Sequence, residues 1–358
     1  MCQNSFLRYL KFTKVEESEM NISLLAIDIA KNVFQLCGVD QNGKILSEKK
    51  VTRAKLIETV NKWSPNKIAM EACGSANYWS REFVSRNIEV NLISPQYVKP
   101  FVKGNKNDKQ DARAIAESAQ RPNMHFVSAK TVDQQDMQSL LRIREGHIEM
   151  RTKVCNQIRG LLAEYGIIVT KGVSKLRNQL PSIFDKETEN GLTARMKGYL
   201  EMQYTLLLTL DEKIAMDDID VKQLAKVNDN CRRIQEIEGV GEITAVAIVA
   251  HIGNGSAFKN GRHLSAYLGL VPKQHSSGNK EQLLGISKRG DKHIRKLLIH
   301  GGRSVVRVTD KKTDRRSCWV NRIKNERGKN KANVAVANKN ARIILAMLKS
   351  GEHYRKSA

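Results

Sequence analysis

The sequence predicts an α/β domain at the amino terminus, an all-helical middle region and a mainly helical carboxyl-terminal domain. Up to about residue 130, short apolar segments alternate with helical patterns, which is typical of an α/β domain with a largely parallel sheet. Between 131 and 230, apolar residues recur at spacings of three and four, as in long amphipathic helices. From 231 to 358, a glycine-containing turn joins two helical patterns and a strongly basic segment follows. A chain of 358 residues is long enough for these three domains.

The amino-terminal domain is expected to span 20–130, after an extension at 1–19 that has no periodic pattern and is expected to be disordered. The stretch "ISLLAIDIAKNVFQLCGVD" predicts an apolar strand, and the "QNGK" turn joins it to a neighbouring strand as a hairpin. A helix in "KVTRAKLIETVNKW", a buried strand in "KIAMEACG", a helix in "SANYWSREFVSRN" and a strand in "IEVNLISP" follow. The segment "NKNDKQDARAIAESAQ" predicts a helix, because its Asn- and Asp-rich start favours capping.

Two long helices are expected in the middle region, one in "QQDMQSLLRIREGHIEMRTKVCNQIRGLLAEYG" and one in "LTARMKGYLEMQYTLLLTLDEKIAMDDI". Joined by a loop, they predict an antiparallel hairpin or coiled coil. In the carboxyl-terminal domain, "IQEIEGVGEITAVAIVAHIG" has the outline of a helix-hairpin-helix, whose turn amides at Gly239 and Gly241 can hold a backbone phosphate. The same pattern also makes a plain helical corner. An apolar helix in "NVAVANKNARIILAMLKSG" is expected near the end of the chain.

The composition points to a polyanionic partner. Lys and Arg total 61 against 37 Asp and Glu, and the formal net charge is +24. Residues 286–358 carry 21 Lys and Arg against 5 Asp and Glu, so most of the surplus lies in this segment and indicates a phosphate-binding surface. No apolar run has the length of a membrane span, and the first residues lack the layout of a signal peptide. Six widely spaced cysteines predict free thiols in a reducing compartment, so we expect a cytoplasmic protein associated with the nucleoid.

Four carboxylates form a candidate metal site. Asp28 lies near the end of the first strand, and Glu71 ends the strand "KIAME", so both would project at one end of the sheet. Asp108 and Asp111 are three residues apart in a predicted helix and share one face. Carboxylates without His or Cys ligands suit hard cations such as Mg²⁺, and two such ions can stabilise the attacking and leaving oxygens of a phosphate displacement. A helix start also favours acidic residues, and Glu71 fits a surface position, but an unpaired Asp28 in an apolar strand is costly to bury.

The stretch "QHSSGNK" holds two adjacent serines, Ser276 and Ser277, directly before a glycine. A serine beside a glycine is typical of a turn, and the stretch alone does not decide between a turn residue and a nucleophile. No histidine–acid triad is evident near Ser277, and His275 would point elsewhere in an extended segment. Five cations follow that could hold a nucleic-acid backbone, although each is also explained by an ordinary basic helix face: Lys288, Arg289, Lys292, Arg295 and Lys296.

A set of motifs resembles one known family. They are "AIDIAK", "MEACGSANYWSREF", "PQYVKPFVKGNKNDKQDARAIAE", "NQIRGLLAEYGI", "IEGVGEITA", "YLGLVPKQHSSGNKEQLLGISKRGDKHIRKLLIHGGR" and "NKNARIILAMLKSGEHY". Together they resemble the transposases of insertion sequence family 110, in particular its 1111 subgroup. The resemblance covers nearly the whole chain after Met20, with the motifs in the right order. Two positions depart from the pattern, since Asn77 stands where a histidine is expected and Arg113 where an acidic residue is commoner.

The resemblance implies a RuvC-like, ribonuclease-H-type domain over 20–130, a coiled coil over 131–230 and a transposase domain with a catalytic serine over 231–358. Matched by motif, the family's Asp-Glu-Asp-Asp site is carried by Asp28, Glu71, Asp108 and Asp111, and its serine by Ser277. Family members are DNA recombinases that use a structured non-coding RNA, the bridge RNA, to pair with target and donor DNA. They work as homo-oligomers, dimers or tetramers, in which the acidic site of one protomer meets the serine of another.

The leading hypothesis is therefore an RNA-guided DNA recombinase that uses two Mg²⁺ ions and a phosphoserine intermediate. In this hypothesis Ser277 attacks the phosphate, and the energy of the broken bond is stored in the link to serine. The first alternative is a structure-specific endonuclease of the Holliday-junction-resolving type, in which the acidic site acts alone and Ser277 is only a turn residue. The second is a nucleic-acid-binding protein without catalytic activity, in which the carboxylates are structural.

Overall fold

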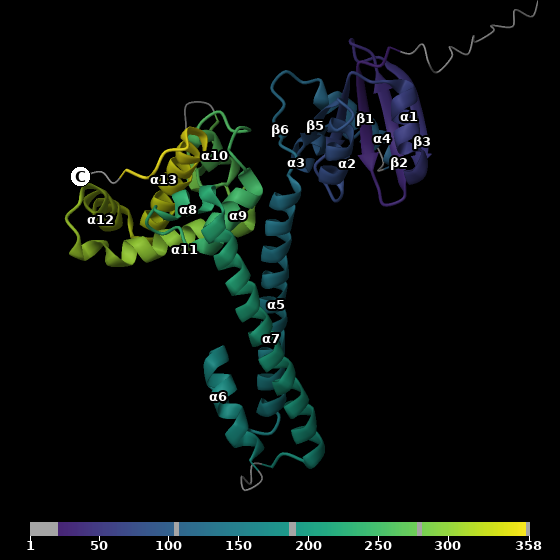
Figure 1. Cartoon of the computed structure of the whole chain (residues 1–358). Helices are drawn as coiled ribbons and strands as arrows, with labels where there is room; N and C mark the ends of the chain where they lie inside the picture. The colour runs from purple at the N-terminus through teal and green to yellow at the C-terminus, as the bar shows by residue number, and fades with distance from the viewer. Residues whose placement is uncertain (1–20, 104–106, 186–190, 278–280, 356–358) are drawn as a thin grey trace, which may run out of the picture. The chain divides into compact units, whose positions relative to one another are not determined.

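The computed structural model describes residues 21–103, 107–185, 191–277 and 281–355. They form two compact units that divide between Thr131 and Val132, named here the amino-terminal and carboxyl-terminal units (Figure 1). The extension expected at 1–19 lies outside the described residues. The amino-terminal unit is mixed α/β, and the carboxyl-terminal unit is almost entirely helical.

A six-stranded sheet forms the centre of the amino-terminal unit, with strand order β3-β2-β1-β4-β5-β6. The strands are β1 (Leu24–Ile29), β2 (Val33–Val39), β3 (Ile45–Thr52), β4 (Lys67–Glu71), β5 (Glu89–Ile93) and β6 (Phe126–Val127). The α/β class is confirmed, but the expectation of a largely parallel sheet is wrong. Only β1/β4 and β4/β5 are parallel, whereas β1/β2, β2/β3 and β5/β6 are antiparallel. The physical reason is connection length, because a parallel crossover needs about a dozen residues and the links around β2 are far shorter.

The predicted hairpin turn joins β2 to β3 rather than following a single long strand. The Asp40 carboxylate accepts hydrogen bonds from the backbone N–H groups of Asn42 (2.8 Å) and Lys44 (2.9 Å), which closes the turn. The apolar stretch before it is broken at 30–32 into β1 and β2, which pair with each other. Sequence periodicity missed this break because both segments are apolar.

Helices cover both faces of the sheet. The helices of this unit are α1 (Leu56–Trp63), α2 (Ala76–Val84), α3 (Pro95–Val98) and α4 (Asp108–Ala119). Leu25 and Ile27 of β1 pack with α1 and α2 in one core, whereas Leu24 and Ala26 pack with α4 in another. This alternation follows the two-residue period of a strand. Asn107 caps α4 by accepting a hydrogen bond from the Gln110 N–H at 2.9 Å, as its Asn- and Asp-rich start predicts.

The carboxyl-terminal unit contains two long helices and a group of shorter ones. They are α5 (Val132–Ala163), α6 (Val173–Phe184), α7 (Ala194–Val227), α8 (Asp229–Gln235), α9 (Glu242–Ile252), α10 (Gly261–Tyr267), α11 (Lys292–Val308), α12 (Arg315–Arg327) and α13 (Lys329–Ser350), with a hairpin of β7 (Pro272–Gln274) and β8 (Leu283–Ile286). The two long helices α5 and α7 lie side by side (Figure 1). Their ion pairs run in opposite order along the chain, Arg144 with Asp218 at 2.7 Å and Arg151 with Asp211 at 2.9 Å. The helices are therefore antiparallel, and the expected loop between them contains α6.

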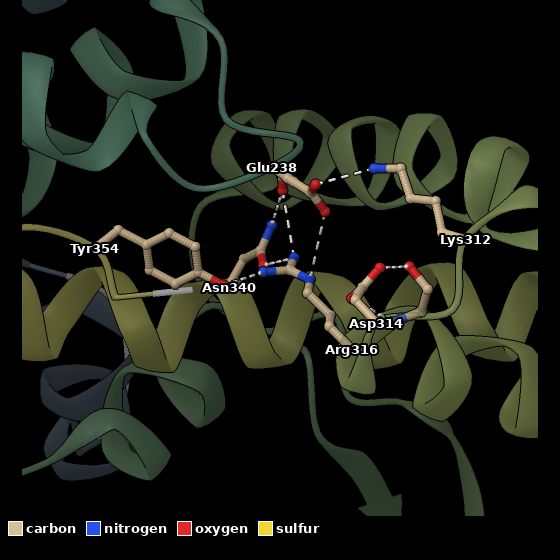
Figure 2. Close-up of polar contacts among 7 residues, drawn as sticks. Glu238, Lys312, Asp314, Arg316, Asn340 and Tyr354 are labelled. Carbon is tan, nitrogen blue, oxygen red and sulfur yellow. Dashed lines mark hydrogen bonds and ion pairs between the residues drawn. The ribbon is translucent and has the colours of Figure 1, made fainter. Parts of the chain in front are cut away.

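The turn between α8 and α9 is fixed by a buried polar network. The backbone carbonyl of Glu238 accepts hydrogen bonds from Asn340 Nδ2 (3.0 Å) and Arg316 Nη2 (3.4 Å), and Figure 2 shows both side chains converging on it. Arg316 also donates to Asn340 Oδ1 (2.7 Å) and to the Tyr354 hydroxyl (2.9 Å), although only 6% of the residue is exposed. A guanidinium is costly to bury unless it is hydrogen bonded, so this network ties the turn to α12 and α13.

Two glycines of α11 allow backbones to approach closely. A methyl group on Gly301 would lie 1.8 Å from the carbonyl oxygen of Gly239 in the turn, and one on Gly302 would lie 2.4 Å from the carbonyl oxygen of Asn333 in α13. Gly239 itself has φ +87°, a conformation that favours glycine. The absence of a side chain at these two positions of α11 therefore sets how closely the turn and α13 can pack against the helix.

In the part of the chain that the structure describes, no helix is long and apolar enough to cross a membrane. The five cysteines in the same part are free thiols, as their spacing predicts: Cys37, Cys73, Cys155, Cys231 and Cys318.

Replacing Gly301 by alanine tests the close approach of α11 to the Gly239 carbonyl. Alanine is favoured over glycine inside a helix by about 1 kcal/mol, but here the methyl group meets backbone atoms that cannot move aside. We expect Gly301→Ala to lower the free energy of unfolding by about 1–3 kcal/mol in urea denaturation. Gly160→Ala is the matched control, because this glycine also lies inside a helix, α5, and a methyl group there has nothing within 4 Å, so the variant should be at least as stable as the wild type. Equal stability of the two variants would contradict the packing argument.

Candidate functional site

Two of the four predicted carboxylates lie at the carboxyl ends of neighbouring parallel strands. The β1/β4 register pairs Ile27 with Met70, and Asp28 and Glu71 are the next residue in each strand. Asp28 shares the strand face of Ala26, and Glu71 shares that of Ala69, because side chains two residues apart point the same way. Ala26 and Ala69 pack with α4, so the sheet directs both carboxylates toward the side where α4 lies.

The other two carboxylates lie in the first turn of α4. Asp108 is exposed and Asp111 is partly buried, and the helix dipole favours negative charge at both positions. Lys50 of β3 lies 3.9 Å from the Asp108 carboxylate. The amino end of α4 thus brings two further carboxylates to the side of the sheet that Asp28 and Glu71 face.

The electrostatics of Asp28 show that the four carboxylates are close enough to affect one another. The pKa of Asp28 is raised to about 6, mainly by burial and then by the charges of Asp111, Asp108 and Glu71, in that order. A carboxylate surrounded by like charges holds its proton more tightly. Together the four side chains concentrate negative charge on the side of the sheet where α4 lies.

The donor set fits a hard divalent cation in chemistry, since all four side chains offer carboxylate oxygens. Within the described residues, however, no three His, Cys, Asp or Glu side chains form a group close enough to hold a metal ion. Electrostatic repulsion acts over longer distances than metal coordination, so the carboxylates can raise the pKa of Asp28 without lying close enough to share an ion. Ion binding would require the carboxylates to draw closer.

Cys73 belongs to the same neighbourhood and was not singled out from the sequence. Burial raises the pKa of its thiol, and the charges of Glu71 and Asp28 raise it further. The thiol is therefore kept protonated beside the carboxylates and is a poor nucleophile. Its position in the sequence, two residues after Glu71 at the end of β4, could have indicated that it lies beside the carboxylates.

The two departures from the family pattern have local partners. Arg113 forms a two-point ion pair with Glu48 of β3, with Nε–Oε1 at 2.7 Å and Nη2–Oε2 at 2.8 Å. Asn77 accepts a hydrogen bond from the Lys130 N–H at 3.0 Å through Oδ1. Both side chains therefore connect elements of the amino-terminal unit: Arg113 joins α4 to β3, and Asn77 joins α2 to the end of the unit.

Ser277 lies in the carboxyl-terminal unit, on the exposed connection that follows β7. The Ser276 hydroxyl accepts a hydrogen bond from Gln274 Nε2 at 3.0 Å, whereas the Ser277 side chain has no hydrogen-bond partner among the described residues. The His275 N–H donates to the Gln282 carbonyl (2.9 Å), which holds the two sides of the hairpin together. The glycine after Ser277 lies outside the described residues. The two serines are thus distinguishable, since among the described residues only the Ser276 side chain forms a hydrogen bond.

The five cations predicted to contact a nucleic-acid backbone differ in their surroundings. Lys288, Arg289 and Lys292 are exposed, but Arg295 is only 8% exposed and donates hydrogen bonds to the carbonyls of Leu268 (3.1 Å) and Arg289. Lys296 pairs with Glu145 of α5 at 2.6 Å. Arg295 is therefore the least accessible of the five, and its expected contact with a nucleic-acid backbone stays a prediction. Its guanidinium holds the loop before α11 in place.

The two glycines of the predicted phosphate-binding turn also differ. Gly239 packs against Gly301, as described above, whereas Gly241 is exposed and precedes the first residue of α9. An exposed helix start leaves N–H groups free for an anion. Of the two, Gly241 is the more exposed, and its contact with a phosphate stays a prediction.

Comparison with known proteins identifies the family. The model of the IS110-type DEDD transposase domain matches residues 25–167, and that of the transposase IS116/IS110/IS902 family matches residues 231–317. The chain is 50% identical to the transposase for insertion sequence element IS1111A of Coxiella burnetii, covering 97% of this chain and 95% of that protein.

Further relatives agree over similar lengths. Identity is 42% to a probable family 20 transposase of Pseudomonas aeruginosa, covering 94% of this chain and 99% of that protein. It is 34% to the transposase for insertion sequence element IS1328 of Yersinia enterocolitica, again covering 94% and 99%. With both family models and these near full-length relatives in agreement, the chain belongs to the IS116/IS110/IS902 family of insertion-sequence transposases.

Proposed function

We propose that this transposase is an RNA-guided DNA recombinase that cleaves and exchanges strands through a covalent link between Ser277 and DNA. The observation that carries the proposal is that β1 and β4 end side by side at Asp28 and Glu71, facing α4, whose first turn holds Asp108 and Asp111; the raised pKa of Asp28 agrees with this arrangement. Strongly shifted carboxylates gather at sites that bind metal ions or move protons. In this proposal Asp28, Glu71, Asp108 and Asp111 would hold two Mg²⁺ ions, which would supply positive charge to the transferring phosphate.

The strand transfer divides the work between the two units. The Ser277 oxygen attacks the phosphorus, a P–O bond to serine forms, and the P–O bond of the DNA breaks so that one strand end leaves as a hydroxyl. The serine proton passes to a base or solvent, and the leaving oxygen gains one. A hydroxyl of the new strand then attacks the phosphoserine, and serine is released without ATP. The exposed Ser277 hydroxyl, unbonded to described residues, supports its role over that of Ser276.

The finer fold assignments belong to the same proposal. We infer a RuvC-like, ribonuclease-H-type fold for 20–130, supported by the mixed sheet with carboxylates at the ends of β1 and β4. We also infer a helix-hairpin-helix around Gly241 and a coiled coil formed by α5 and α7 in the middle of three domains. The antiparallel ion pairs between those helices support the latter.

The proposed partners are element and target DNA, the bridge RNA and further copies of the chain, acting in the cytoplasm on nucleoid DNA. Self-association is supported by apolar side chains on the outer face of α7, at spacings of three and four. Tyr199, Met202 and Leu206 are all exposed there. Such a stripe is typical of a helix that packs against another helix.

The covalent link can be tested directly. Protein is incubated with element DNA, bridge RNA and Mg²⁺, then denatured, and DNA attached to protein is measured on a denaturing gel. We expect Ser277→Ala to lose the attachment and Ser276→Ala to keep it, because only Ser277 supplies the oxygen. Free cleaved ends in the Ser277→Ala sample would favour the endonuclease alternative, and no strand breakage with any divalent metal would favour the binding protein. Omitting the RNA should abolish attachment to specific DNA.

Asp28→Asn should raise stability while abolishing strand cleavage. The folded-state pKa of Asp28, about 6, lies above its ordinary 3.8, so the folded protein loses stability as the pH rises through 6. A neutral asparagine avoids this loss. We expect the metal-free variant to be more stable than the wild type by about 1–2 kcal/mol at pH 8, after allowance for solvent screening, with the gap closing toward pH 4.

Chemical denaturation across this pH range measures the gap, and Asp108→Asn is the matched control. Asp108 is exposed at a helix start, so its loss should slightly destabilise the protein. Mg²⁺ or Mn²⁺ should raise the melting temperature of the wild type more than that of Asp28→Asn. If Asp28→Asn is less stable than the wild type at pH 8, Asp28 is a structural residue.

Charging the outer face of α7 should weaken self-association. We expect Met202→Glu to shift the protein toward monomer in sedimentation velocity, because a carboxylate would be buried in the helix contact. Ala215→Glu is the control, since Ala215 is exposed on α7 but lies off the stripe. An unchanged size distribution in Met202→Glu would show that copies associate elsewhere or not at all.

A further inference from the structure

A large basic groove lies along α12 and α13. Its wider part, with a volume of about 1690 Å³, is bounded by these helices, the β7–β8 hairpin and the start of α10. A second hollow of about 880 Å³ continues it toward the end of α13. The two parts share Trp319, Arg322, Lys339, Ile343 and Ala346, so they form one continuous groove, named here the α12–α13 groove.

The charge of the groove is almost entirely positive. Nine Lys or Arg residues line the groove, against two acidic residues, Glu326 and Glu352. Elsewhere in this unit, cations such as Lys296 and Lys312 pair with carboxylates, at 2.6 and 3.0 Å. Within the described residues, Arg322 and Arg342 of the groove have no such partner. The pKa of Lys339 is lowered by burial and by the nearby Arg316, Arg315 and Arg342, as expected where positive charge is uncompensated.

The groove also offers apolar surface that a solvated basic face would lack. Trp319 is partly buried between its two parts, and Lys339 Nζ lies 4.3 Å from the centre of its ring. Leu283 and Leu284 of β8 line another side, with 67% and 43% of their surface exposed. An aromatic ring and apolar side chains beside cations suit a nucleobase next to its phosphate.

These features favour an unpaired strand over a duplex or a second copy of the chain. In a duplex the bases are stacked inside and cannot lie on an indole, whereas an unpaired strand exposes them. A second copy of a chain with net charge +24 would be repelled by this groove. DNA and RNA share the chemistry that the groove recognises, a phosphodiester backbone and an unstacked base.

We propose that the α12–α13 groove binds an unpaired nucleic-acid strand, with a base stacked on Trp319 and phosphates held by Arg322, Lys339 and Arg342. The inference rests on the proposed action on nucleic acid, but not on Ser277 or the carboxylates. None of the five cations expected to contact a backbone before and within α11 lines the groove. The α12–α13 groove would thus be a second nucleic-acid-binding surface, one that contacts unpaired bases.

The test uses the full chain and a short fluorescent oligonucleotide of one mixed sequence, as single-stranded DNA, single-stranded RNA and duplex DNA. Anisotropy titrations should show that Trp319→Leu weakens single-strand binding about tenfold. Trp319→Phe should keep most of it, and duplex binding should change little. Arg342→Gln should weaken binding and flatten its salt dependence, whereas the exposed Lys222→Gln on α7 should leave both unchanged. A preference for DNA or RNA then identifies the strand.

Tryptophan fluorescence gives a second readout. Trp63 and Trp79 are 1% and 4% exposed, so an oligonucleotide that stacks on an indole should quench mainly Trp319. The quench should vanish in Trp319→Phe, whose far-ultraviolet circular dichroism should match the wild type. Unchanged single-strand affinity in both Trp319→Leu and Arg342→Gln would overturn the proposal, as would a quench that persists in Trp319→Phe. Asp28→Asn and Ser277→Ala should bind the oligonucleotide normally, so failure of the recombinase mechanism and failure of this groove are separate results.

Discussion

The amino-terminal unit depends on one constraint, that β1 must bury both of its faces. It lies between β2 and β4 in the sheet, and its alternate side chains pack into two different cores. Because strand side chains alternate, this packing fixes the direction of the Asp28 side chain. Asp28 comes directly after Ile27 and therefore lies on the opposite face, the one that packs with α4. The parallel pairing with β4 then sets Glu71 beside it. A register shift of one residue would turn Asp28 away from α4 and expose the apolar core.

The same arrangement gives the folded protein a negative charge at Asp28 that lowers its stability. Asp28 is partly buried and surrounded by three like charges, which raises its pKa to about 6. The rest of the unit must supply the stability that this cluster removes, and the large buried aromatic side chains Trp63, Phe34 and Phe83 are the obvious source. Repulsion of this kind is relieved when a cation is bound, so a destabilised cluster is suited to a metal-dependent reaction.

The sequence predicted the parts of this molecule that depend on local pattern. Strand ends located Asp28 and Glu71, and the Asn- and Asp-rich start located α4. It did not predict the direction of β2, because that depends on how short the link at 30–32 is rather than on the strand itself. The burial of Arg295 could not be predicted either, since its partners are the backbone carbonyls of Leu268 and Arg289, which leave no signal in the side-chain pattern. The contact of Gly239 with Gly301 joins segments about sixty residues apart.

Net charge illustrates the difference between composition and structure. The basic segment at 286–358 reads as one uniform phosphate-binding surface, yet its cations fall into separate groups. Arg316 is buried and holds the Glu238 turn, Lys296 is paired with Glu145, and Arg342 lines the groove beside Trp319. A buried or paired cation contributes little to attracting a distant phosphate, because its charge is already balanced or bound to carbonyls. The attraction of this unit for nucleic acid must therefore arise from the smaller set of exposed cations without carboxylate partners, and their positions decide where a strand can lie.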